Sequence, residues 1–169
     1  MKYSSFEELP VWQASTEFAL RVFDLTNRLD LSGLGDMKNQ LERAALSISN
    51  NIAEGFERGS TTELINFLYI ARGSAGESRS MLRICESLTR FSDFKSEISD
   101  LIGRAVNISK QLHGWLESLK NTNIKGPKFL TERERERLAS EREFAEFDRE
   151  MERYRMELLE RLNTRATGG

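Results

Sequence analysis

The sequence predicts an all-α protein, an antiparallel, up-down-up-down four-helix bundle with an additional long C-terminal helix. Four stretches of the chain repeat apolar residues at helical spacing, and only short polar segments separate them. The 2 prolines, Pro10 and Pro127, lie where helices are expected to start or stop, so neither interrupts a stretch. No segment shows the alternation of apolar and polar residues that is typical of a strand.

The first two helices are expected at about 10–29 and 37–56. Pro10 suits the first turn of a helix, because the N–H that it lacks would have no partner there. A loop rich in glycine and serine follows, and Asp36 is the expected N-cap of the second helix. The expected apolar faces consist of Val11, Trp12, Phe18, Ala19, Val22, Phe23 and Leu25, and of Leu41, Ala45, Ile48, Ile52 and Phe56.

The third helix is expected to begin after Ser60 and to end at about Thr89, and the fourth covers about 93–120. Ser60 and Glu63 have the spacing of a capping box. The expected inner face of the third helix consists of Phe67, Ile70, Ala71, Ser74, Ala75, Ser78, Met81, Leu82 and Cys85. These elements predict a bundle domain over 1–120.

A linker over 121–130 and a charged amphipathic helix over 131–165 are expected to follow the bundle. Thr131 and Glu134 have the spacing of a second capping box. Apolar side chains then recur at spacings of three and four, and they are Phe144, Phe147, Met151, Tyr154 and Leu158. Because an exposed line of such residues is unfavourable, the stripe is expected to cover the bundle, to pair between subunits or to bind a partner.

Composition limits the possible functions. The chain has 25 Lys and Arg against 27 Asp and Glu, and from residue 131 onward 9 Arg face 11 acids, so the first 130 residues carry no net charge. A nucleic-acid site must therefore come from local clustering. No apolar run is long enough to span a membrane, and the N-terminus does not resemble a signal peptide. With Cys85 as the 1 cysteine, these features favour the cytoplasm.

No set of residues predicts catalysis, and neither a metal nor another cofactor is expected. His113 is the 1 histidine, and Cys85 lies on an expected apolar face, where it would serve as a small core residue. The spacings that zinc sites, di-iron bundles and phosphate-binding loops require do not occur. The protein is therefore expected not to be an enzyme.

A polar stripe on the second helix has two interpretations. Its members share a sector of about 80° at 100° per residue, opposite the apolar stripe, and they are Arg43, Ser47, Asn51, Glu54 and Arg58. A solvated face, with Glu54 paired to Arg58, is one interpretation. A polar interface with another subunit is the other, since short Ser and Asn side chains suit a close contact.

Four arginines on the third helix are candidates for binding phosphate. Arg72, Arg79, Arg83 and Arg90 fall within about 40° of one another around the helix axis. A guanidinium suits phosphate because its planar fork binds two oxygens at once. The alternative is a solvated face, where Glu86 would pair with the last two arginines and weaken the row.

Three strings carry a resemblance to a known family: LPVWQAS (9–15), QLERAALSISNNIAEGFERGS (40–60) and FLYIARGSAGES (67–78). They resemble the four-helix-bundle proteins encoded in intervening sequences of bacterial 23S rRNA genes. The same bundle is similar to the accessory variability determinants of diversity-generating retroelements. The resemblance covers about 6–120 and leaves the C-terminal helix outside it. The family's motif residues fall here on Asn51, Glu54, Gly55, Gly73, Ser74 and Glu77, and they include no catalytic set.

The resemblance implies a homopentameric barrel that binds nucleic acid and, in the retroelement relatives, a reverse transcriptase. Together with the arginine row, it leads to the hypothesis of a non-catalytic, homo-oligomeric scaffold that contacts RNA or DNA through phosphates. The alternative hypothesis is a protein-interaction scaffold that recruits a partner through its C-terminal helix. Arginines that pair with carboxylates would favour this alternative.

Overall fold

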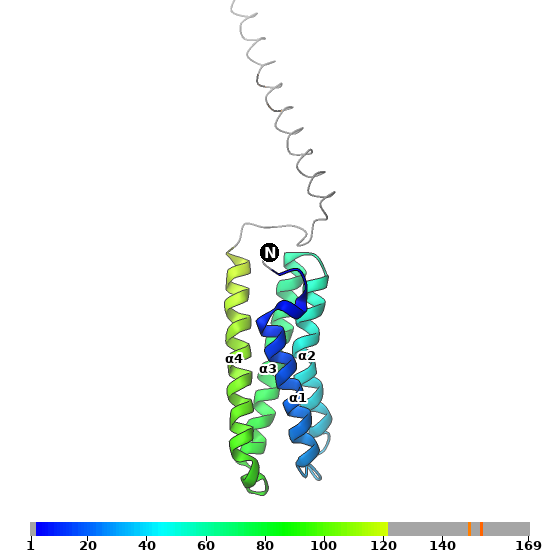
Figure 1. Ribbon diagram of the computed structural model, residues 1–169, viewed down its shortest axis with the longest axis vertical. Coiled ribbons are helices and arrows are strands. Elements are labelled where there is room, and N and C mark those ends of the chain that lie inside the picture. Colours follow the sequence, from blue (N-terminus) through cyan, green and yellow to red (C-terminus); the bar gives the residue numbers. More distant parts are fainter. Residues whose placement is uncertain (1–2, 122–148, 150–152, 154–169) are drawn as a thin grey trace, which may run out of the picture. The chain divides into compact units, whose positions relative to one another are not determined.

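The computed structural model describes residues 3–121 together with Arg149 and Arg153, two exposed helical positions. Within 3–121, the chain forms a bundle of four long helices (Figure 1). These are α1 (Pro10–Arg28), α2 (Met37–Glu57), α3 (Thr61–Ser87) and α4 (Lys95–Lys120). Two short 3-10 helices, η1 (Phe6–Glu8) and η2 (Thr89–Phe94), precede α1 and α4. The predicted four-helix bundle is confirmed, and the predicted linker and C-terminal helix lie almost wholly outside the described residues.

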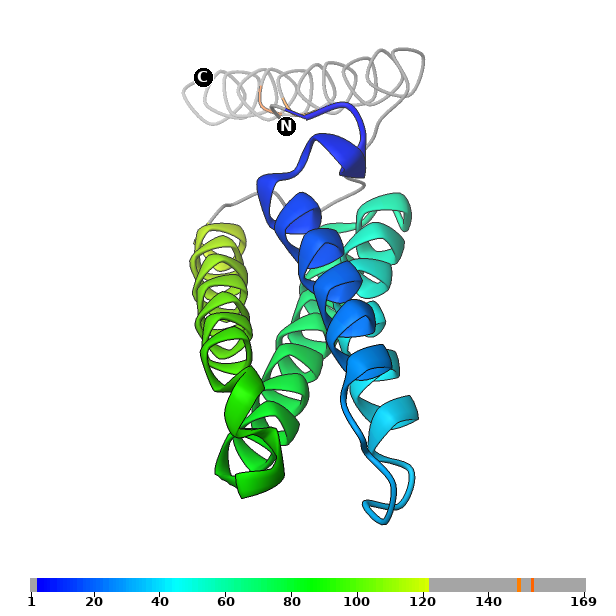
Figure 2. The same ribbon diagram turned by 60° about the horizontal axis from the view of Figure 1, so that its bottom comes forward.

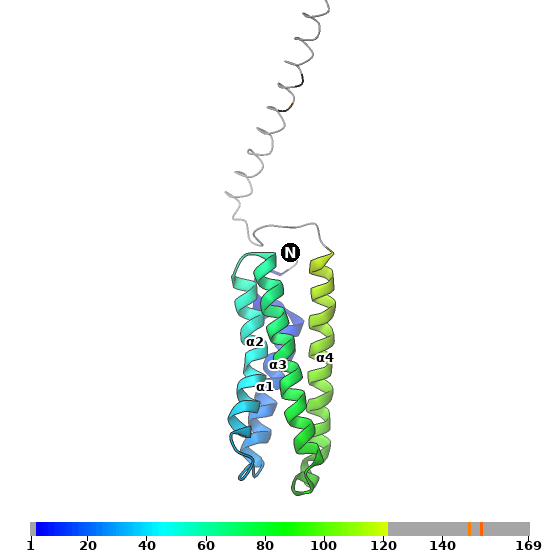
Figure 3. The same cartoon turned by 180° about the vertical axis from the view of Figure 1, so that it is seen from behind.

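The helices run alternately down and up, so α1 begins and α4 ends at the same end of the bundle (Figures 1 and 3). Each helix packs on its neighbour along the chain, and α1 also packs on α4 (Figure 2). Helices α1 and α3 are therefore diagonal partners, and their outward faces point in different directions. None of the described helices is long and apolar enough to cross a membrane.

The helix ends follow the predicted signals with two exceptions. Ser60 caps α3 as expected, because its Oγ accepts a hydrogen bond of 3.2 Å from the backbone N–H of Glu63. Asp36 is the N-cap residue of α2, as predicted, but its side chain does not cap the helix, since its Oδ1 accepts from the side-chain amide of Asn39 instead. Helix α3 ends at Ser87 rather than Thr89, and η2 then turns the chain toward α4.

The core consists of one layer of apolar side chains from all four helices. The largest fully buried ones are Phe18, Phe56, Leu25, Leu41, Ile48, Ile52, Leu64, Leu68, Leu82, Ile98, Leu101 and Ile108. The predicted core is wrong at one residue, Ile70, which is 50% exposed. The inner face of α3 is set by Leu64, Leu68 and Ala71, and Ile70 is turned 100° away from Ala71.

Helices α2 and α3 approach each other most closely near the end of α2. Gly55 is buried there, and a Cβ atom on it would lie 2.7 Å from the Cβ of Phe67. Arg58 closes this end with ion pairs to Glu54 at 2.6 Å and to Glu63 at 3.7 Å. The missing side chain of Gly55 therefore sets how tightly the two helices pack.

Candidate nucleic-acid interface

The arginine row predicted on the third helix is shorter in the structure. Arg72, Arg79 and Arg83 belong to α3, where Arg72 is half-buried and the other two are exposed. Arg90 lies in η2, beyond the end of α3. Its guanidinium donates to the backbone oxygen of Ser32 at 3.0 Å and covers the ring of Phe91. The prediction that Arg90 continues the row is therefore wrong, because the helix ends before it.

Glu86 pairs with one arginine rather than two. Its carboxylate accepts from Arg83 at 2.6 Å. Arg90 contacts Ser32 and Phe91 instead, so it does not share this carboxylate. The pair is on the surface, and such pairs are worth about 0–1 kcal/mol. Glu86 consequently reduces the positive charge beside Arg83 without burying the guanidinium.

Helix α4 contributes charges beside the α3 arginines. Lys120 lies 5.3 Å from the ring centre of Tyr69 and 3.0 Å from Glu117. The hydrogen bond from Lys120 lowers the pKa of Glu117, and the charges of His113 and Arg72 lower it further. The hydrogen bond with Tyr69 and the contacts with Glu117 raise the pKa of Lys120. The cations at this end of the α3–α4 surface therefore favour the charged form of Glu117.

The register between α3 and α4 extends this pairing along the bundle. The two helices are antiparallel, so seven residues forward on α3 and seven back on α4 lead from Arg72 and Glu117 to Arg79 and Lys110. Both new residues are exposed, and neither has a hydrogen bond or ion pair within the described residues. The register thus aligns two cations on neighbouring helices, and neither of them is paired with a carboxylate of the described residues.

We call Arg72, Arg79, Arg83 and Lys110 the basic row. Its three arginines span 11 helical positions, or about 17 Å. The sequence prediction missed Lys110 because it considered a row on one helix only. Lys110 lies on the neighbouring helix, α4. The seven-residue spacing to Glu117 is visible in the sequence, but it becomes informative only with the register of α3 against α4.

The surface between α1 and α4 differs, because its arginines face carboxylates. Arg104 lies 3.2 Å from Glu17, and Arg21 lies 3.6 Å from Asp100. Arg28 pairs with Glu97 in the same way. These cross-helix pairs neutralise the arginines, so this surface has little to offer a phosphate.

The polar stripe predicted on α2 divides between two environments. Ser47 is half-buried, and its Oγ lies 2.9 Å from that of Ser74 on α3. The amide of Asn51 donates to the backbone oxygen and Oγ of Ser47 at 2.7 and 2.9 Å. The stripe was predicted to lie opposite the core. This prediction is wrong for its middle residues, Ser47 and Asn51, which lie at the edge of α2 next to α3. The predicted Glu54–Arg58 pair is confirmed.

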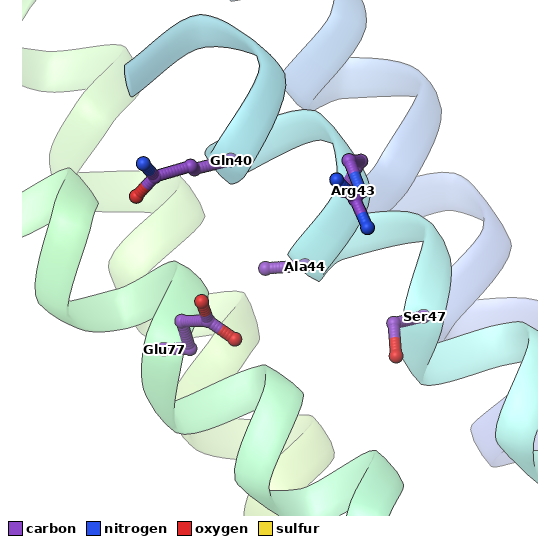
Figure 4. A pocket seen from close by; sticks show the side chains of 5 residues that line it. All are labelled: Gln40, Arg43, Ala44, Ser47 and Glu77. Atoms are coloured by element: carbon purple, nitrogen blue, oxygen red, sulfur yellow. The ribbon is translucent and has the colours of Figure 1, made fainter. Parts of the chain in front are cut away.

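A pocket of about 400 Å³ lies where this stripe borders α3. Gln40, Arg43, Ala44 and Ser47 line it from α2, and Glu77 reaches into it from α3 (Figure 4). Arg43 and Glu77 are both exposed, and neither has a hydrogen bond or ion pair within the described part of the chain. Their charges therefore remain available to a molecule that docks on this face.

The remaining candidate residues are placed as follows. His113 is exposed on α4, and Cys85 is buried with its Sγ 3.8 Å from the Sδ of Met37. Burial raises the pKa of the Cys85 thiol. Over residues 3–121, no three His, Cys, Asp or Glu side chains gather as metal ligands would. The predicted stripe of Phe144, Phe147, Met151, Tyr154 and Leu158 lies outside the described residues.

Fold and surface together define a class: a four-helix-bundle protein with exposed cations on α3 and α4, of which Arg79 and Lys110 have no ion pair within the described residues. The family model of the 23S rRNA-intervening sequence protein matches residues 7–114. The chain belongs to this family, as its sequence resemblance implied.

One solved structure has the same fold over most of the bundle. It is the crystal structure of a protein with unknown function from the S23 ribosomal protein family of Bacteroides thetaiotaomicron. The two chains are 26% identical with a TM-score of 0.57, and the match covers 63% of this chain and 98% of the other. No curated protein is similar enough to this chain to match it.

Proposed function

We propose that the protein is a non-catalytic, homo-oligomeric scaffold that binds RNA or DNA through phosphate contacts in the cytoplasm. The observation that carries the proposal is that Arg79 and Lys110, which the helix register aligns, have no carboxylate partner within the described residues. Like charges on adjacent helices repel each other, and a phosphate bound between them would remove this repulsion. The basic row offers such an anion four cations.

The length and chemistry of the basic row fit a polyanion. Arginine predominates in it, and a guanidinium can bind two phosphate oxygens at once. The row runs for about 17 Å along the helices, so it can contact several successive phosphates of one strand. Contacts to phosphates carry no sequence information directly, so little sequence preference is expected.

Assembly would multiply the strength of the site. Residues 1–130 carry 16 basic and 16 acidic groups, so a single copy attracts a polyanion weakly. Several copies would place several basic rows on one particle, and linked sites bind a long ligand more tightly than one site does. The resemblance to homopentameric relatives supports five copies. A place beside a reverse transcriptase in a diversity-generating retroelement is the narrower form of the proposal.

The experiment is an equilibrium titration of the full chain with labelled single-stranded RNA and DNA at several salt concentrations. Arg79→Glu and Lys110→Glu should each weaken binding at least tenfold. Arg79→Ala should reduce the slope of log affinity against log salt by about 0.7. The control is Lys95→Glu, which changes the net charge equally but lies about 22 Å from Lys110 on α4.

Two outcomes would contradict the proposal. Wild-type protein that binds neither nucleic acid at low salt would remove it and leave the protein-interaction hypothesis, with 131–165 as the recruiting segment. Equal losses in Arg79→Glu and Lys95→Glu would show that net charge matters and that the basic row is not a site.

A further inference from the structure

Apart from the basic row, α3 and α1 each carry an outward row of exposed residues. On α3, the outer seam consists of Ile70, Gly73, Glu77, Ser80 and Ile84, which recur at alternating spacings of three and four. This is the spacing of a helix that packs on another helix. The inner face of α3 already packs in the core, so the outer seam is a separate, exposed face of this helix.

The α1 crest is the matching row on the diagonal helix. It consists of Gln13, Glu17, Leu20, Asp24 and Asn27, all exposed and also spaced by three and four. Leu20 at its centre is 62% exposed, the highest value among the exposed large hydrophobic residues described. An isolated exposed leucine is common, but one at the centre of a heptad row is placed as a knob.

The shape of the outer seam suits such a knob. Ile70 and Ile84 are 50% and 47% exposed, and 14 residues, or about 21 Å, separate them. Glycine and serine leave a hollow between them beside Glu77: no atom lies within 4 Å of where a Cβ would be on Gly73 or on Gly76, one turn further along. Ser80 continues this low stretch, so a leucine from another helix can approach the α3 backbone between the two isoleucines.

The charges beside the two rows are complementary. Arg43 borders the pocket next to the outer seam and has no ion pair within the described residues. Glu17 and Asp24 flank Leu20, and their side chains remain 54% and 70% exposed beside the arginines of their own bundle. Asn27 accepts from Lys38 through Oδ1, so its amide N–H groups remain available to a docked helix.

We propose that the α1 crest of one copy packs on the outer seam of the next copy. Leu20 fills the low stretch between Ile70 and Ile84, while Arg43 faces the carboxylates of Glu17 and Asp24. This interface rests on the homo-oligomer of the proposed function and names the two faces that build it. Because α1 and α3 are diagonal in the bundle, the contact is head-to-tail, and such contacts build rings or filaments rather than simple two-fold dimers.

The test uses two variants, each of which removes one of the two faces. Leu20→Glu destroys the crest and leaves the outer seam intact, whereas the double variant Ile70→Glu/Ile84→Glu does the reverse. Each variant alone should be monomeric by light scattering. Their mixture should form a 1:1 heterodimer, because one intact crest meets one intact seam. Asn107→Glu, on the outward face of α4, is the control and should keep the wild-type mass.

All the substituted side chains are exposed, so circular dichroism should show unchanged helix content. Either variant with the wild-type mass, or a mixture that stays monomeric, would overturn the interface. A monomeric wild-type chain would overturn both the interface and the oligomeric part of the proposed function. An oligomeric wild type whose Leu20→Glu variant is also oligomeric would overturn the interface alone. Titration with RNA at the basic row reports on the proposed function separately.

Discussion

A Cβ atom on Gly55 would lie 2.7 Å from the Cβ of Phe67, closer than side chains tolerate. Gly55→Ala should therefore force α2 and α3 apart and destabilise the bundle by about 1–3 kcal/mol. Gly103→Ala is the control, because nothing lies within 4 Å of a Cβ there. It should stabilise the helix by up to about 1 kcal/mol. Urea unfolding measures both, and equal effects would contradict the close approach.

The exposure of Ile70 can be tested against a buried residue of the same helix. Leu82 is fully buried, so Leu82→Ala should cost about 2–5 kcal/mol of unfolding free energy. Ile70→Ala should change it by about 0.5 kcal/mol or less, as is usual for surface positions. Thermal or chemical unfolding of the two variants gives the comparison. A large loss of unfolding free energy in Ile70→Ala, measured at a concentration where the protein is monomeric, would show that Ile70 is buried in the core.

Glu117 should titrate below the usual range of a glutamate. The hydrogen bond from Lys120 lowers its pKa in the folded state. This contribution to stability is therefore present above the ordinary glutamate pKa and is lost as pH falls through the lowered value. In Lys120→Met, the pKa of Glu117 should move toward the ordinary range, as NMR titration would show. An unchanged pKa would mean that another group holds the carboxylate in its charged form.

Light scattering of the wild-type chain should give a mass near five times 19.5 kDa. The outer seam leads us to expect assembly, and the number five comes from the resemblance to the family described above. Dilution through the micromolar range should shift the mass toward one copy if assembly is reversible. A single copy at every concentration would contradict the assembly.

The predicted C-terminal helix can be tested by truncation after Lys128. If the stripe from Phe144 to Leu158 packs on the bundle or between subunits, burying two or three of its side chains contributes about 1.5–3 kcal/mol each. The truncated chain should then melt at a lower temperature or have a smaller oligomer mass. No change in either property would mean that the segment is a free tail or an arm that binds a partner.

The sequence was sufficient to predict the helices because their signals are local. Spacings of three and four residues defined the apolar faces. The capping box at the start of α3 is also a local signal, because Ser60 caps Glu63, only three residues away. The errors came from features that depend on neighbouring elements. Ile70 fits the period of α3 but is turned away from the core, and Asp36 is engaged by Asn39 instead of the helix end.

The candidate site was less predictable because it depends on register. The α3 arginines were visible as a row, but the early end of α3 separates Arg90 from them. Lys110 joins the row only through the antiparallel alignment of α4, which the one-dimensional pattern does not contain. The hydrogen bond between the side chains of Ser47 and Ser74 joins residues 27 positions apart, so the sequence offered no local signal for it.

Because Cys85 is buried, the reactivity of its thiol can report how often the folded bundle opens. This thiol is the 1 cysteine of the chain, it lies in the core beside Met37, and burial raises its pKa. A thiolate-directed reagent can therefore reach it only when the bundle opens around α3. The alkylation rate of the native protein then measures the frequency of opening without an introduced label. Bound nucleic acid or a neighbouring subunit that holds the bundle closed would slow this rate.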